Sequence, residues 1–222
     1  MEKKFLKVSF QLVVFAGILA LFSVMVSGCS AFKPAEASAD EEVKVQLDQM
    51  DASLDAMIEN DPALASSSNP YDYIVGGKNQ YYNTLIALGP KALPALEDAL
   101  YNSKYDGLTE YLIAVAIEEI TQADVKDITG DPYAWSDANE FSEQWKGIKE
   151  SVPESIDEIL QSNEWNEEEK LDRIEAYGLL AIPILEQELS QGEMEESFSE
   201  IVQEYVDDHP LDAVEEKSLR IQ

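Results

Sequence analysis

Residues 86–100 read Ile-Ala-Leu-Gly-Pro-Lys-Ala-Leu-Pro-Ala-Leu-Glu-Asp-Ala-Leu, and residues 175–189 read Glu-Ala-Tyr-Gly-Leu-Leu-Ala-Ile-Pro-Ile-Leu-Glu-Gln-Glu-Leu. The two stretches align without gaps, and an internal repeat of this kind indicates that one structural unit occurs twice. Gly89, Ala92, Pro94, Leu96, Glu97 and Leu100 recur 89 positions later as Gly178, Ala181, Pro183, Leu185, Glu186 and Leu189.

The spacing of glycine and proline gives each copy a physical interpretation. A glycine just past a helix adopts the left-handed conformation that ends it, and a proline in the first turn of the next helix costs no backbone hydrogen bond. Each copy is therefore predicted to be a helix, a tight turn and a second helix.

The segments around the two copies also carry helical patterns. Residues 108–120 are apolar on most sides, which predicts a buried helix, and residues 194–205 carry one apolar stripe, which suits an end helix. Residues 136–162 resemble a diverged copy, in which Gly147 and Pro153 mark a turn and Ser151 with Glu154 has capping-box spacing. We expect about eight helices and no strand, and hence an all-α fold.

Residues 40–60 are predicted to form an amphipathic helix that begins with a capping box at Ser38 and Glu41. Two interpretations stay open: a helix folded onto the domain, or a short coiled-coil or partner-docking helix. Residues 61–78 are rich in proline, serine and glycine and are predicted to form a loop.

The pattern Gly-x-x-Ala-x-Pro-x-Leu-x-x-x-Leu at 89–100 and 178–189 is similar to HEAT-like repeats of the armadillo type. The loop from Ile120 to Trp145 also resembles the threonine-glycine and tryptophan segments that follow such repeats in bacterial exported proteins. The resemblance implies a short HEAT-like α-solenoid of stacked antiparallel helix pairs over 79–208, followed by a C-terminal tail at 209–222. It implies a non-catalytic scaffold that binds a protein partner of unknown identity.

Residues 1–28 are typical of a cleaved export signal. Three lysines lie within the first seven residues, and the segment from Leu12 to Val26 is almost wholly apolar. This run is shorter than the roughly 20 residues that a transmembrane helix needs, although Val8 to Gln11 would lengthen it. An uncleaved membrane anchor is therefore the alternative.

Val26, Ser27, Gly28 and Cys29 follow the apolar run directly, and Cys29 is the only cysteine in the chain. The four residues resemble the lipobox of bacterial lipoproteins. The resemblance implies cleavage before Cys29 and a diacylglycerol on its sulfur, so that acyl chains such as palmitate anchor the protein on the outer face of a bacterial cell membrane. Residues 29–39 are small and polar and are predicted to be a flexible spacer.

The chain is strongly acidic, with 45 acidic and 15 basic residues and a net charge of −30. Such a surface repels nucleic acid and anionic lipid headgroups, so we expect no nucleic-acid partner and membrane contact through the lipid alone. His209 is the only histidine, lipidation would consume the only thiol, and no phosphate-binding loop is present. We therefore expect no zinc site and no cofactor.

Two alternative functions rest on carboxylates. Paired carboxylates are the catalytic groups of glycan hydrolases, which suggests a cell-wall-acting enzyme. Asp124, Asp127 and Asp131 lie in one segment with Gly130, which suggests a calcium-dependent surface adhesin, although their spacing is not that of an EF-hand.

Tyr71 and Tyr73 belong to a segment with many tyrosines. Because tyrosines are frequent in binding hot spots, we consider these two as candidate partner-binding residues. The alternative is that they pack between helices.

Overall fold

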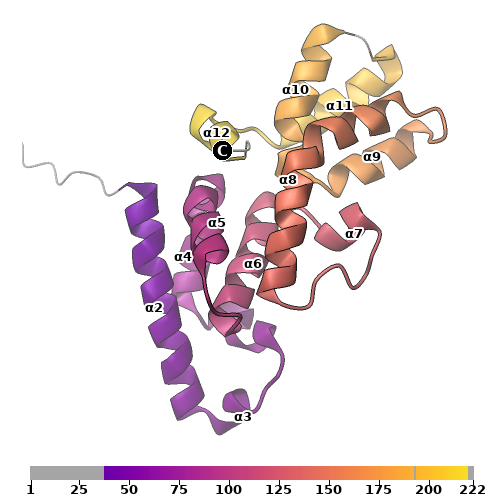
Figure 1. Cartoon of the computed structure of the whole chain (residues 1–222). Helices are drawn as coiled ribbons and strands as arrows, with labels where there is room; N and C mark the ends of the chain where they lie inside the picture. The colour runs from indigo at the N-terminus through magenta and orange to yellow at the C-terminus, as the bar shows by residue number, and fades with distance from the viewer. Residues whose placement is uncertain (1–37, 193, 220–222) are drawn as a thin grey trace, which may run out of the picture. The chain divides into compact units, whose positions relative to one another are not determined.

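The computed structural model describes residues 38–192 and 194–219, and these contain helices and turns but no strand, which confirms the all-α fold (Figure 1). Residues 1–28 and the lipobox at 26–29 lie outside the described residues. No helix of the described part is both long and apolar enough to cross a membrane. The helices are α2 (Ala39–Asn60), α3 (Pro62–Ala65), α4 (Gln80–Leu88), α5 (Leu93–Asn102), α6 (Leu108–Thr121), α7 (Val125–Thr129), α8 (Ala138–Gln161), α9 (Glu167–Glu175), α10 (Ile182–Gln191), α11 (Glu196–Asp208) and α12 (Ala213–Leu219).

Short 3₁₀ helices join several of these elements. They are η1 (Pro70–Tyr73), η2 (Val75–Gly77), η3 (Gly89–Ala92) and η4 (Gly178–Leu180). The predicted loop at 61–78 therefore contains α3, η1 and η2, and the predicted loop from Ile120 to Trp145 contains α7 and the start of α8.

Both copies of the repeat form the predicted helix, turn and helix. The turn glycines have positive φ, 63° at Gly89 and 52° at Gly178. Pro94 and Pro183 are the second residues of α5 and α10, where no intrahelical hydrogen bond is lost. The short turns between the helices are η3 in the first copy and η4 in the second.

The second copy lies directly against the end of α6. This helix ends at Thr121, and its C-cap residue Gln122 has a left-handed φ of 57°. A Cβ atom on Gly178 would lie only 2.3 Å from the Thr121 carbonyl oxygen. The Asp124 amide also donates to the Ala176 carbonyl over 2.9 Å. Glycine is therefore required at 178 by a close approach of two backbones as well as by its φ.

α6 is buried on most sides, as its sequence predicts, and it packs against α4, α5 and α8. α2 runs beside α4 and buries Val43, Met50 and Leu54 (Figure 1). Ser38 caps α2 by accepting a hydrogen bond from the Glu41 amide over 3.3 Å. Of the two interpretations of this segment, the structure supports a helix folded onto the domain.

The predicted turn within 136–162 is wrong, because α8 is one continuous helix of 24 residues with Pro153 inside it. Gly147 and Pro153 are both exposed, whereas Phe141, Trp145 and Ile156 are fully buried on the opposite face. The uninterrupted apolar face outweighs the helix-breaking tendency of Pro153. Ser151 forms no cap, because its hydroxyl donates to the Ile148 carbonyl over 3.1 Å.

The C-terminal segment is more than a tail, because α12 packs against η3 of the first copy. Lys91 lies 2.9 Å from Asp212 and 3.8 Å from Glu215, and these contacts raise the Lys91 pKa. Leu219 is buried. The chain therefore returns from the second copy to the turn of the first.

Candidate functional site

The two candidate tyrosines have different surroundings. Tyr73 is 5% exposed, and its hydroxyl donates to the Leu64 carbonyl over 2.9 Å. Tyr71 is 42% exposed and meets the edge of Tyr111, with ring centres 6.4 Å apart. Burial of its hydroxyl, with smaller effects from Tyr111 and Glu118, raises the pKa of Tyr71 to about 12. Tyr73 is thus a packing residue, and of these two tyrosines only Tyr71 is exposed to solvent.

The aspartates suggested for calcium are hydrogen-bonded to nearby backbone. Asp124 is the N-cap of α7 and accepts hydrogen bonds from the Lys126 and Asp127 amides, and Asp131 accepts one from the Tyr133 amide. Among the described residues, no group of three His, Cys, Asp or Glu side chains is arranged to hold a metal ion. These hydrogen bonds give Asp124 and Asp131 a structural role in the turns around α7.

His209 follows the last residue of α11. Its Nδ1 atom lies 2.8 Å from the Tyr205 carbonyl oxygen, and its ring lies against the Tyr205 ring, with centres 4.6 Å apart. A ring nitrogen thus lies at a carbonyl oxygen of the last turn of α11.

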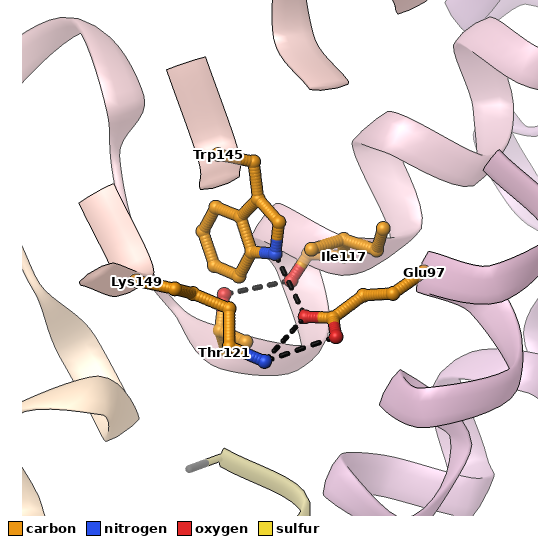
Figure 2. Close-up of polar contacts among 5 residues, drawn as sticks. All are labelled: Glu97, Ile117, Thr121, Trp145 and Lys149. Atoms are coloured by element: carbon orange, nitrogen blue, oxygen red, sulfur yellow. Dashed lines mark hydrogen bonds and ion pairs between the residues drawn. The ribbon is translucent and has the colours of Figure 1, made fainter. Parts of the chain in front are cut away.

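A buried ion pair between α5 and α8 is the polar cluster that the sequence did not predict. Lys149 donates to both carboxylate oxygens of Glu97 over 2.9 Å, and the Trp145 indole N–H donates to Oε1 over 2.8 Å (Figure 2). Glu97 is 9% exposed and Lys149 is 8% exposed. Beside them, Thr121 donates to the Ile117 carbonyl over 2.7 Å, within α6 (Figure 2).

The ion pair joins two helices that are far apart in the sequence. Its carboxylate receives three hydrogen bonds, which compensate for the removal of its charge from water. The repeat-equivalent Glu186 is exposed, so this role belongs to one copy only. The recurring glutamate and the one-turn spacing of Trp145 and Lys149 were the available signals, but the sequence alone does not pair them.

A groove lies between α2 and the segment that leads into α6; we call it the α2–α6 groove, and its volume is about 550 Å³. Ile58 and Tyr105 on its border are 39% and 77% exposed. The Thr109 hydroxyl donates to Asp51 over 2.6 Å and so connects the two walls. Its lining is Lys44, Leu47, Asp48, Asp51, Leu54, Asp55, Ile58, Ala99, Tyr105, Gly107, Leu108, Thr109, Glu110 and Ile113.

A second hollow of about 710 Å³ lies between α10 and α11, and six of its eleven lining residues are acidic. Two apolar residues, Leu189 and Met194, also line it. Its carboxylates are Glu188, Glu196, Glu200, Glu204, Asp207 and Asp208. The α2–α6 groove differs because two of its large hydrophobic residues, Ile58 and Tyr105, are exposed.

Comparison of the chain with protein-family models, with curated proteins and with solved structures finds no match.

Proposed function

We propose that this protein is a bacterial lipoprotein with HEAT-like helical repeats, held on the outer face of the cell membrane by a lipid on Cys29, where it binds a protein partner without catalysing a reaction. The observation that carries the proposal is the sequence from Val26 to Cys29, which places the only cysteine directly after a long apolar run. Two acyl chains at this position hold a protein stably, whereas one holds it only marginally.

The length of the spacer supports this arrangement. The described unit begins at Ser38, nine residues after Cys29. Nine residues span at most about 30 Å. A lipid on Cys29 would therefore keep the helical unit close to the membrane, where it meets membrane proteins and other proteins of the cell surface.

The composition of the surface supports binding of a protein. Ile58 and Tyr105 expose apolar area beside the α2–α6 groove. A partner that covers this area removes it from water, which favours binding. Glu97 and Lys149 are buried and bonded to each other, so this ion pair offers little polar surface to a partner. A HEAT-like arrangement of helices fits the same role, because such repeats bind proteins along extended surfaces.

The anchor is tested by intact-mass analysis and detergent-phase partitioning of the protein isolated from the cells that produce it. We expect a chain that begins at Cys29 and carries a diacylglycerol, whereas Cys29→Ser should keep residues 1–28 and gain no lipid. Ser27→Ala is the matched control, because it keeps a small residue and should be processed like wild type. A wild-type product that retains Met1 or carries a free thiol would refute the anchor.

The binding role is tested by cross-linking and affinity capture of the lipidated protein from cells. We expect one stable protein partner whose capture is insensitive to chelator. Cleavage of purified peptidoglycan by the protein would favour the hydrolase instead, and capture that disappears with chelator would favour the calcium-dependent adhesin.

A further inference from the structure

Apolar side chains line part of the α2–α6 groove. Leu54 and Ile113 are buried at the floor, and Ile58 and Tyr105 are exposed at the border. Covering the exposed side chains of Ile58 and Tyr105 with a partner is favourable by roughly 25 cal/mol per Å² of apolar area removed from water. Apolar side chains of a partner would therefore gain by packing against these two residues.

The charged residues of the groove have one dominant sign. Four carboxylates line it, at Asp48, Asp51, Asp55 and Glu110, against the single ammonium of Lys44. Asp51 accepts the hydrogen bond from Thr109, and Glu110 accepts hydrogen bonds from Ser103 and Gly107. Asp48 and Asp55 are thus the carboxylates on α2 that the groove offers to a cationic ligand.

The length of the groove sets the size of its occupant. The α2 residues that line it run from Lys44 to Ile58, which is about 21 Å along a helix of 1.5 Å rise per residue. A partner helix of about 15 residues has the same length. The groove is lined by helices and a loop and contains no strand edge, so recognition by strand addition does not apply to it.

We propose that the α2–α6 groove binds a basic amphipathic helix of the protein partner, with the apolar stripe of that helix on the groove floor and lysines or arginines beside Asp48 and Asp55. The inference rests on the proposed binding function and specifies the chemistry of its ligand. Charge complementarity selects this occupant over a second copy of the chain, because each copy has a net charge of −30 and the same acidic border.

A designed peptide tests the groove directly. The unit that begins at Ser38 has its own hydrophobic core, so the chain from Ser30 onward is used without lipid or detergent, after circular dichroism has confirmed that it is helical. The probe is a labelled 15-residue peptide with leucines on one helical face and lysines beside them. A scrambled peptide of the same composition is its control. We expect fluorescence anisotropy to give at least tenfold tighter binding of the amphipathic peptide, weakening as salt increases.

Variants then locate the binding site. The double variant Asp48→Asn with Asp55→Asn should weaken peptide binding by roughly tenfold, from the loss of two exposed charge pairs. Glu200→Gln with Glu204→Gln in the α10–α11 hollow changes the net charge equally and should leave the affinity within about twofold of wild type. Tyr105→Ala, at a residue 77% exposed, should weaken binding by roughly tenfold without changing the melting temperature.

Equal binding of the amphipathic and scrambled peptides would overturn the inference. Equal losses of peptide affinity in the two charge-neutralised double variants would also overturn it, because they would indicate long-range attraction by the whole acidic surface. If lipidated variants altered at Asp48, Asp55 and Tyr105 capture the protein partner as efficiently as wild type does, the partner binds at another surface. That result would overturn the groove while leaving the proposed binding function intact.

Discussion

Replacement of Gly178 by alanine tests the close contact between the second repeat copy and the end of α6. The new Cβ atom would lie 2.3 Å from the Thr121 carbonyl oxygen and 2.5 Å from the Gln122 carbonyl carbon. Both neighbours are backbone atoms, so the overlap cannot be relieved by rotation of a side chain. The turn or the end of α6 has to move.

Two separate costs add at this position. A left-handed φ costs a residue other than glycine about 1–2 kcal/mol, and forced overpacking costs about 1–3 kcal/mol. Gly178→Ala should therefore lower the free energy of unfolding by about 2–5 kcal/mol. In a domain of this size, that corresponds to a decrease in melting temperature of roughly 5–15 °C.

Gly130→Ala is the matched control, because Gly130 has a φ of 67° and a Cβ atom there meets nothing within 4 Å. Only the backbone cost remains at this position, about 1–2 kcal/mol. Urea unfolding followed by circular dichroism measures both variants. If the two lose the same free energy within about 0.5 kcal/mol, the close approach at Gly178 contributes nothing and the reasoning is refuted.

Three further predictions follow from the surroundings of single side chains. Glu97→Ala leaves Lys149 buried without a counter-charge and should lower the free energy of unfolding in urea by about 3–5 kcal/mol. Glu186→Ala, at the exposed equivalent position, should change it by no more than about 0.5 kcal/mol. Tyr73→Ala should lower the free energy of unfolding by about 3–5 kcal/mol and lower the melting temperature, whereas Tyr71→Ala should lower this free energy by about 1 kcal/mol. Similar losses in both variants would contradict the assignment of Tyr73 to the core and Tyr71 to the surface. Burial raises the pKa of Glu118, so the contribution of this carboxyl group to stability is lost as pH rises through that pKa. Glu118→Gln should therefore stabilise the protein relative to wild type more at pH 7 than at pH 4. An advantage that is equal at both pH values would contradict this assignment.

The fold was predictable where the local signal and the tertiary packing agree. Gly89 with Pro94 and Gly178 with Pro183 predict two turns that the structure contains, because each residue type favours its backbone conformation without help from neighbours. Gly147 and Pro153 predict a turn that does not form. There, the continuous apolar face of α8 provides more stabilisation than the proline removes.

The candidate site was harder to predict because its parts come from distant segments. Glu97 and Lys149 are 52 residues apart, and the walls of the α2–α6 groove are joined by a hydrogen bond between residues 58 positions apart. Composition identifies the acidic surface but gives no position on it. The packing of α12 on η3 was missed for the same reason, since Lys91 and Asp212 show no relation in the sequence.

Three of the basic residues have partners within the folded unit. Lys149 forms the buried ion pair with Glu97. Lys146 Nζ lies 4.1 Å from the centre of the Tyr101 ring, and Arg173 Cζ lies 4.0 Å from the centre of the Trp165 ring. Lys146 thus joins α8 to α5, whereas Arg173 contacts the loop that precedes its own helix. The chain has 45 acidic against 15 basic residues, so most carboxylates have no cation to neutralise them. Added salt therefore screens repulsion among carboxylates within the folded unit, and it also screens their attraction for a basic partner. Salt should stabilise the fold while it weakens the complex, a pairing of effects that a purely apolar groove would not produce.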